Sequence, residues 1–485
     1  MKSFKIKSLA FLFLTFVLMI NLLTSCTTEP KSEPNKKPNI IVIFADDMGY
    51  GDVGIYGHPT IKTPNIDRMA VEGQKWTNYY VASSLCSPSR AALLTGRLPI
   101  RTGITQVLFP NSEKGLPQTE KTIADFLKEN GYNTAMVGKW HLGDKSPFLP
   151  TDHGFDSYFG IPYSNDMDRI EEFGKKGWID SQISWADQEN FKAYNFPLLR
   201  DDKIIERPVD QRSITKRYTK EAIDKISEFR NNPFYINLAY TMPHIPLFRS
   251  EEFKDVSLAG IYGDVIEEID WSVGQVLNAL KKEGLYKNTL VVFTSDNGPW
   301  HIYKTHAGSA GLFQGAKGGT FEGGFRVPTI FSWPEKIKSG VITDMGSTMD
   351  LLPTFCALTD TKLPTDRIFD GYDISPVLLG TGVSPRDEIY YYRGDKVYAV
   401  RKGKYKAHFI TQLSWDKSRT SRFVTDPEID ISEKPKMLET PLLYNVNVDP
   451  AERYNIADKH PEVIEAFKNL LIDHQKNINH QINKK

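Results

Sequence analysis

One cysteine stands in a setting that favours chemistry. Cys86 opens the segment Cys86-Ser87-Pro88-Ser89-Arg90, and Pro88 is well placed for the first turn of a helix that continues to Thr95. Cys86 then lies at the helix N-terminus, where the dipole and the free N–H groups favour an anion. Arg90 lies near the same face. A buried structural cysteine is the more common case, but Pro88 and Arg90 favour a nucleophile that faces an anion.

Oxygen-donor side chains follow two apolar runs of the chain. Asp46-Asp47 follows the run 39–44, and Asp296-Asn297 follows the run 289–294. Carboxylate and amide oxygens, with no Cys or His among them, suit Ca²⁺ or Mg²⁺ rather than zinc. Either pair alone fits a solvated loop or a turn. Two pairs at matching strand ends indicate one shared cation.

Basic side chains follow two more runs of the same kind. The run 134–138 leads to Lys139 and His141, and the run 234–239 leads to His244. Continuous apolar, β-branched runs suit strands that are buried on both faces of a parallel sheet. Ligands bind outside the carboxyl ends of the strands in such sheets. We therefore expect the acidic and basic side chains to converge at one edge.

Helical patterns over 122–129 and 262–282 alternate with these strands. The alternation predicts a doubly wound α/β fold, with a large, mixed or mostly parallel sheet flanked by helices. The pattern changes near residue 385, where 388–393 and 396–401 predict strands of a smaller antiparallel sheet and 462–479 predicts a closing helix. We predict a catalytic domain over residues 39–384 and an α+β subdomain over residues 385–485.

The N-terminus has the composition of an export signal. Three lysines precede the apolar run 9–23, which ends at Leu23-Thr24-Ser25-Cys26. This ending resembles the lipobox of bacterial lipoproteins, in which the cysteine is acylated. We predict a signal peptide over residues 1–26, a tether over residues 27–38, and a cell-envelope lipoprotein that touches the membrane only through its lipid. An ordinary cleaved signal, with Cys26 incidental, is the alternative.

The remaining composition excludes two classes of protein. Lys+Arg and Asp+Glu number 60 each, so the chain lacks the basic excess that is typical of nucleic-acid binders. If Cys26 is acylated, only Cys86 and Cys356 remain, which is too few for a disulfide framework. Cys86 therefore needs another explanation.

The motifs together resemble the formylglycine-dependent sulfatases, the type I sulfatases of the alkaline-phosphatase superfamily. Cys86-Ser87-Pro88-Ser89-Arg90 with the downstream Leu94-Thr95-Gly96-Arg97 resembles the signature of the family. Other family motifs follow in order, at 46–47, 138–143, 153–156, 243–244, 295–298 and 315–328. Within the family the resemblance is to arylsulfatase A-like enzymes, through 160–166, 403–411 and 443–450. It runs from about residue 39 into the C-terminal region and implies an alkaline-phosphatase-like sheet.

The resemblance implies an activity and its cofactors. A maturation enzyme would oxidise Cys86 to Cα-formylglycine, and one Ca²⁺ would be held by position 86 with Asp46, Asp47, Asp296 and Asn297. One hydroxyl of the hydrated aldehyde would attack sulfur, and the second, helped by His141, would expel sulfate. Arg90 and Lys139 would stabilise charge. Lys317 and His244 would bind sulfate, and one of them would protonate the leaving oxygen.

The substrate is less well defined than the chemistry. The arylsulfatase A-like enzymes have a histidine where this chain has Asn165, and the stretch 411–440 lacks a histidine that the resemblance predicts. Candidate substrate contacts are Ser164, Asn165, His301 and His306. An exported enzyme of this kind suggests a sulfated carbohydrate.

Two other functions compete with this interpretation. A formylglycine-dependent phosphonate monoester or phosphodiester hydrolase would share the motifs, whereas a two-zinc phosphatase would have Asp-His in place of Asp296-Asn297. A non-catalytic surface lipoprotein that binds glycans would have no need of Lys139, His141 and Lys317.

Overall fold

The computed structural model describes residues 37–170, 178–412 and 437–482. The predicted signal peptide over residues 1–26, its Cys26 and most of the tether lie outside these residues, as does most of the stretch 411–440. Residues 38–485 form one compact unit. Among the helices of the described residues, none has the length and apolar character needed to cross a membrane.

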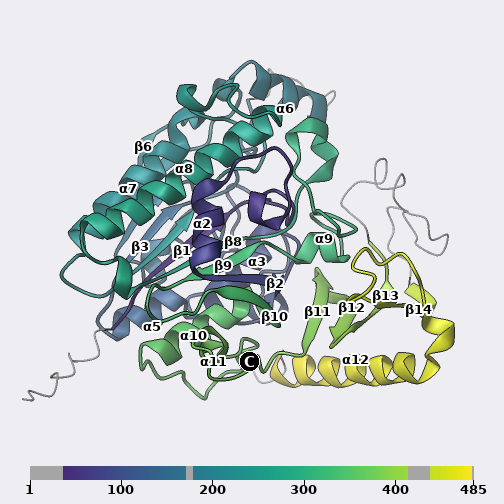
Figure 1. Cartoon of the computed structure of the whole chain (residues 1–485). Coiled ribbons are helices and arrows are strands. Elements are labelled where there is room, and N and C mark those ends of the chain that lie inside the picture. The colour runs from purple at the N-terminus through teal and green to yellow at the C-terminus, as the bar shows by residue number, and fades with distance from the viewer. Residues whose placement is uncertain (1–36, 171–177, 413–436, 483–485) are drawn as a thin grey trace, which may run out of the picture. The chain divides into compact units, whose positions relative to one another are not determined.

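The larger sheet contains the strands whose ends carry the predicted site. Its strands are β1 (Asn39–Ala45), β2 (Gln74–Tyr80), β3 (Asn133–Gly138), β4 (Ser157–Gly160), β5 (Leu198–Arg200), β6 (Lys203–Glu206), β7 (Phe234–Ala239), β8 (Thr289–Ser295), β9 (Thr329–Ser332) and β10 (Gly340–Ser347). They are hydrogen-bonded in the order β10-β2-β9-β8-β1-β7-β3-β4-β5-β6 (Figure 1). The predicted large, mostly parallel sheet is confirmed.

The four predicted strands are neighbours at the centre of this sheet. β8, β1, β7 and β3 run parallel to one another in that order. Their carboxyl ends therefore meet at one edge, as expected, and the side chains that follow them are brought together. The antiparallel members are β9, which separates β8 from β2, and the hairpin β5–β6 at the far edge.

Helices cover both faces of the larger sheet (Figure 1). The helices of the described chain are α2 (Pro64–Glu72), α3 (Cys86–Thr95), α4 (Pro99–Thr102), α5 (Ile123–Glu129), α6 (Trp178–Asp187), α7 (Ile214–Glu228), α8 (Gly260–Lys282), α9 (Glu322–Phe325), α10 (Leu351–Leu358), α11 (Ser375–Leu378) and α12 (Pro461–Ile482). Ile41 and Ile43 of β1 share a core with α2, α7 and α8, whereas Val42 and Phe44 share a second core with α3, α5 and α10. Successive side chains of β1 point to opposite faces of the sheet, so its continuous apolar run contributes to both cores.

The smaller sheet is antiparallel, as predicted. It contains β11 (Glu388–Arg393), β12 (Lys396–Lys402), β13 (Tyr405–Ile410) and β14 (Met437–Asn445) in chain order. Helix α12 lies alongside it (Figure 1) and contributes Ile464 and Phe467 to a core shared with Val400 and Leu443. The predicted closing helix is present; it begins one residue earlier and ends three residues later than predicted.

Gly138 ends β3 at a point of very close backbone approach. Its φ is 107°, and a Cβ atom there would lie 1.8 Å from the carbonyl oxygen of Ala239 on β7. The same oxygen accepts a 2.8 Å hydrogen bond from the backbone N–H of Lys139. The absence of a side chain at Gly138 therefore allows β3 and β7 to stay paired up to the first residue of the site.

We predict that Gly138→Ala lowers the free energy of unfolding by about 3 kcal/mol or more, because the new methyl group overlaps a backbone atom and the φ is unfavourable. The matched control is Gly131→Ala, where φ is also positive, at 83°, but a Cβ atom would meet open space. That control should cost only about 1 kcal/mol. Urea unfolding followed by tryptophan fluorescence measures both, and equal losses would contradict the prediction.

Candidate active site

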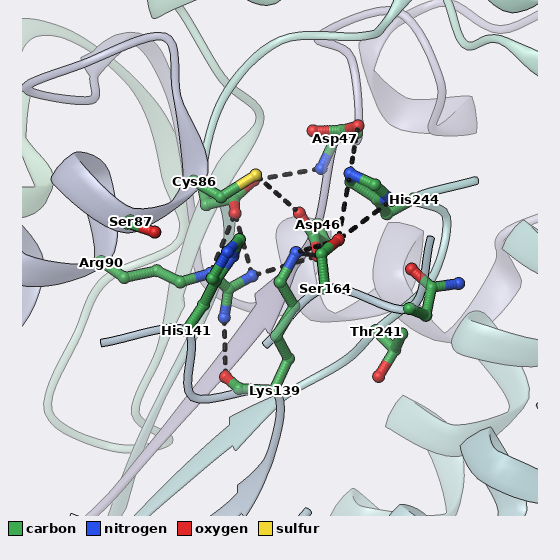
Figure 2. Close-up of polar contacts among 12 residues, drawn as sticks. Asp46, Asp47, Cys86, Ser87, Arg90, Lys139, His141, Ser164, Thr241 and His244 are labelled. Atoms are coloured by element: carbon green, nitrogen blue, oxygen red, sulfur yellow. Dashed lines mark hydrogen bonds and ion pairs between the residues drawn. The ribbon is translucent and has the colours of Figure 1, made fainter. Parts of the chain in front are cut away.

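The side chains that follow the four central strands lie together beyond their carboxyl ends. Asp46, Asp47, Lys139, His141 and His244 surround Cys86 (Figure 2). All of them are buried. Asp47 and His141 have positive φ values of 64° and 61°, a backbone conformation that costs about 1–3 kcal/mol for a residue other than glycine and is often found at functional sites.

Cys86 is the first residue of α3, as predicted. The sulfur lies 3.5 Å from Asp46 Oδ1 and accepts a 3.2 Å hydrogen bond from Lys317 Nζ. Burial raises the pKa of the Cys86 thiol, and the nearby cations Lys139 and Lys317 only partly oppose this shift. The thiolate is the nucleophilic form of cysteine, so the unmodified side chain is held in its unreactive state.

Arg90 connects α3 to the ends of β3 and β8. Its Nε and Nη2 donate to Asp296 Oδ2 at 3.1 and 2.9 Å, and its Nη1 donates to the carbonyl of Lys139 at 2.8 Å. The guanidinium also lies over the ring of Phe44, 5.2 Å from its centroid. These contacts hold the Arg90 side chain from several directions, and its role beside position 86 stays a prediction.

Two lysines are paired with the two adjacent aspartates. Lys139 Nζ donates to Asp46 Oδ2, and Lys317 Nζ donates to Asp47 Oδ2 at 2.8 Å. Burial alone would raise the pKa of Asp46, but Lys139 and Arg90 outweigh it and hold that pKa well below its ordinary value. Burial raises the pKa of Asp47 despite Lys317, and the negative charge of Asp46 adds to the rise.

Ser164 joins the remaining basic groups. Its hydroxyl lies 3.0 Å from Lys139 Nζ and 3.3 Å from His244 Nε2, and His244 Nε2 lies 3.6 Å from Asp47 Oδ2. Burial, with Lys317 and Lys139 nearby, lowers the pKa of His244 well below its ordinary value. The imidazole is therefore neutral near pH 7 and can accept a hydrogen bond. His141 Nε2 donates to the carbonyl of Leu108 at 2.9 Å.

The oxygen donors fit a cation. Asp46, Asp47, Cys86 and His244 have potential ligand atoms within 4.8 Å of one another. Asn297 Nδ2 donates to Asp47 Oδ1 at 2.7 Å, while its Oδ1 is buried without a hydrogen-bond partner among the described residues. Such a buried acceptor is expected to have a ligand. The amide oxygen and the carboxylates are the donors that a hard divalent cation prefers.

Asp296 is held differently from the other predicted ligands. Its Oδ1 accepts from the backbone N–H of Asp47 at 3.0 Å, and its Oδ2 binds Arg90. Burial and the neighbouring Asp46 raise the pKa of Asp296 to about 7. Repulsion among three buried carboxylates causes part of that rise, and a bound cation would relieve it.

The predicted substrate contacts have different environments. Ser164 lies within the site. Asn165 is fully buried, and its amide nitrogen donates to Gln211 Oε1 at 3.0 Å and to the carbonyl of Pro246 at 3.1 Å. Its Oδ1 is buried without a hydrogen-bond partner among the described residues, so a contact between Asn165 and a substrate stays a prediction. His306 is also buried, with Nε2 3.1 Å from Asp187, whereas His301 is partly exposed.

Two residues near the site, Trp300 and Asp166, were not predicted. Trp300 is partly exposed and packs against both sulfate-binding candidates: Lys317 Nζ lies 4.4 Å from its ring centroid, and the His244 ring lies 5.5 Å away. The available signal was its position three residues after Asn297, at the same strand end. Asp166, also unpredicted, is a buried carboxyl whose pKa is raised by that burial, against the opposing effect of Lys139 and Lys317.

Comparisons with known proteins agree over most of the chain. A family model described as Sulfatase matches residues 38–361, and one described as C-terminal region of aryl-sulfatase matches residues 384–485. Arylsulfatase A of Homo sapiens is 42% identical over 451 residues, which cover 90% of this chain and 87% of that protein. N-acetylgalactosamine-6-sulfatase of Mus musculus is 38% identical over 470 residues, covering 91% and 86%. The structure of the PsFucS1 sulfatase from Pseudoalteromonas sp. has a TM-score of 0.78 at 28% identity, covering 92% and 91%.

We predict that Arg90→Lys lowers the free energy of unfolding by about 2 kcal/mol or more. A lysine keeps the charge but cannot contact Asp296 and the carbonyl of Lys139 together, so a buried acceptor loses its donor. The control is Arg200→Lys, because Arg200 binds Glu221 through two hydrogen bonds of 2.9 and 2.8 Å at the surface. That change should cost less than about 1 kcal/mol. Thermal unfolding compares the two, and a smaller loss at Arg90 would contradict the prediction.

Proposed function

The chain belongs to the sulfatase family and is a sulfuric ester hydrolase, and on this premise we propose that it removes sulfate from a sulfated carbohydrate, with formylglycine derived from Cys86 and one Ca²⁺ ion. The observation that carries the proposal is the setting of position 86. Cys86 lies at the start of a helix, between the ammonium of Lys317 and the carboxylate of Asp46, yet burial keeps its thiol protonated. A group other than the thiol is needed there.

Formylglycine, once hydrated, would supply one hydroxyl to attack sulfur and a second to release sulfate. The first turn of α3 supports this position because the dipole of the helix places partial positive charge at its N-terminus, where position 86 lies. His141 is a candidate to accept a proton from position 86. Burial, with Lys139 and Arg90 nearby, lowers the pKa of His141 well below its ordinary value, which leaves the imidazole neutral and able to accept.

The charges of the site suit a sulfate ester. Asp46, Asp47 and Asp296 balance Arg90, Lys139 and Lys317. A divalent cation held by Asp46, Asp47, Asp296, Asn297 and position 86 would add a fixed positive charge for a sulfate oxygen, and the site would then carry a surplus of positive charge. Such preorganised charge stabilises an anionic transition state.

Lys317 and His244 would bind sulfate oxygens, and one of them would protonate the leaving oxygen. Burial alone would lower the pKa of Lys317, but Asp47 and position 86 outweigh it and raise that pKa above its ordinary value. Lys317 is therefore protonated and can donate. Neutral His244 donates through Nδ1 to the carbonyl of Ile245 at 2.6 Å, so its Nε2 is an acceptor until it takes up a proton. Trp300 packs against both and limits where their side chains can move.

A sulfated carbohydrate is the proposed substrate. One relative is named for sulfate at position 6 of N-acetylgalactosamine, and the N-terminal residues have the pattern of an exported lipoprotein anchored through Cys26. A cell-envelope enzyme would meet external sulfated polysaccharide, and a maturation enzyme would have to supply the modification of Cys86 before the chain becomes active.

We predict that the peptide containing position 86 has the mass of formylglycine in active preparations, and that Cys86→Ala lowers sulfate release at least 1,000-fold, because the alanine has no group that can attack sulfur. Cys356→Ala is the control, since Cys356 is buried on α10 away from the site. Tryptic mass spectrometry and ion chromatography of sulfate make the measurements. Full activity in a preparation with only the thiol would refute the proposed nucleophile.

The reaction class is tested by a panel of substrates. We expect release of sulfate from sulfated mono- or oligosaccharides and from an aryl sulfate. Phosphonate monoesters and phosphodiesters that carry the same aryl leaving group as that sulfate should be hydrolysed more slowly. Phosphonate hydrolysis that exceeds sulfate hydrolysis would replace the proposed reaction. Turnover of aryl sulfates without any of the sulfated sugars would overturn the proposed substrate alone.

We predict about one equivalent of Ca²⁺ per chain by plasma mass spectrometry, because the donors are oxygens once position 86 has lost its sulfur. Asn297→Ala should lower both the bound Ca²⁺ and the activity, since it removes a buried oxygen without adding a charge. Asn130→Ala, which alters an amide bound to Thr359 and Thr361, should leave the metal content unchanged. Stoichiometric zinc in place of Ca²⁺ would contradict the assignment.

A further inference from the structure

The segment 317–322 joins the active site to the smaller sheet. It begins at Lys317, whose ammonium contacts Asp47 and Cys86, and it ends at Glu322, the first residue of α9. Both of these side chains are buried. The position of Lys317 therefore depends on what holds the five residues that follow it.

One side of the segment is attached to the reacting residues. The backbone N–H of Lys317 donates to the carbonyl of Pro299 at 3.0 Å, two residues beyond Asn297. The N–H of Gly318 donates to the carbonyl of Ser84 at 2.9 Å, two residues before Cys86. Backbone contacts of this kind set where the segment starts, but they do not reach its far end.

The other side of the segment is attached to the smaller sheet and its neighbours. These contacts join the carbonyl of Gly318 to Arg393 of β11, the N–H of Thr320 to the carbonyl of Gln412, and the ring of Phe321 to the ring of His408 on β13. Phe321 also shares a small core with Leu442 and Tyr444 of β14. The smaller sheet thus holds the segment at Gly318 and Phe321, and Gln412, just beyond β13, holds it at Thr320.

Glu322 forms the strongest of these attachments. Its Oε1 accepts from Tyr391 at 2.5 Å and from Lys406 Nζ at 3.1 Å, and its backbone N–H donates to Glu452 Oε2 at 2.7 Å. Lys406 Nζ also lies 3.0 Å from Glu452 Oε1. Lys406 therefore bridges two carboxylates, and all three side chains are completely buried.

The charge of Glu322 is maintained by its surroundings. Burial alone would raise the pKa of its carboxyl, but Lys406, Arg401 and Arg326 outweigh it and lower that pKa below its ordinary value. Charge-assisted hydrogen bonds are short and directional. This cluster consequently restrains the backbone at Glu322 more tightly than apolar packing would.

We infer that Glu322, Lys406 and Glu452 are positioning residues for Lys317: by fixing the end of the segment 317–322, they place its ammonium between Asp47 and position 86. The inference rests on the proposed function, because it takes Lys317 to bind the sulfate group. The smaller sheet would then take part in the reaction by positioning Lys317, although Lys317 is not a residue of that sheet.

A second buried ion pair provides a matched comparison. Arg386, which precedes β11, donates from Nε to Asp350 Oδ2 at 3.0 Å, and both side chains are buried. This pair also connects the C-terminal region with the larger part of the chain, and within the part of the chain that the structure describes neither member is hydrogen-bonded to the segment 317–322. If the Glu322 cluster contributed only to stability, breaking it and breaking the Arg386–Asp350 pair should have the same effect on activity for the same loss of stability.

The experiment is a double-mutant cycle with the full-length, matured protein. Glu452→Ala removes the acceptor of the Glu322 N–H and should lower kcat for a fluorogenic aryl sulfate 10- to 100-fold. In a Lys317→Ala background the same change should have an effect of less than threefold, because the side chain that it positions is absent. Two residues that act through the same interaction give such non-additive effects on kcat, because the second substitution removes what the first has already impaired. Glu452→Gln, which keeps an oxygen for the same N–H, should recover at least a third of the activity.

Arg386→Met is the control variant. It should lower the melting temperature about as much as Glu452→Ala does, yet reduce kcat by less than threefold. Hydrogen exchange adds a readout that needs no turnover: Glu452→Ala should accelerate exchange at least fivefold in peptides covering 317–325, and Arg386→Met should not. This arm still tests the inference if the wild-type chain releases no sulfate, an outcome that would reject the proposed function by itself.

Two results would overturn the inference. Equal losses from Glu452→Ala in the wild-type and Lys317→Ala backgrounds would show that the cluster acts independently of Lys317. Equal loss of kcat in Arg386→Met and Glu452→Ala, with unchanged exchange in 317–325, would show that the cluster contributes stability alone.

Discussion

The burial of Asp46, Asp47 and Asp296 within one small volume is the constraint on which the rest of the structure depends. An unpaired buried carboxylate is very costly, so cations must be brought to all three. Arg90 comes from the start of α3, Lys139 from the end of β3, and Lys317 from the segment before α9. Each cation comes from a different element, so each element must end at the right place beside the carboxylates. For Lys139 this requires β3 to stay paired with β7 up to Gly138, where only a residue without a side chain fits.

Much of this arrangement could be predicted because its signals are local. Each central strand is a continuous apolar run that ends in ionisable residues, and Pro88 marks the first turn of α3. Such patterns involve only a few neighbouring residues, so they can be recognised in the sequence without knowledge of the fold. In a parallel sheet the carboxyl ends of neighbouring strands meet at one edge. With the observed order β8-β1-β7-β3, this edge brings Asp46, Lys139, His244 and Asp296 together, as expected.

The remainder depends on contacts between distant residues, which leave no local pattern. Glu322 and Glu452 are 130 residues apart, and nothing near either residue indicates that the two meet. Asn165 illustrates the same limit in the segment that follows β4. Its amide nitrogen binds Gln211 and the carbonyl of Pro246, which lie 46 and 81 residues farther along the chain. The direction in which a loop side chain points is decided by partners elsewhere in the chain.

The dependence of Lys317 on Glu452 also has a consequence for synthesis. A ribosome makes Cys86 early and Glu452 almost last, so the pocket cannot close until nearly the whole polypeptide has emerged. In the folded protein the sulfur of Cys86 is buried and contacts Lys317 of the segment 317–322. The proposed modification of position 86 would therefore have to take place before this segment closes over it.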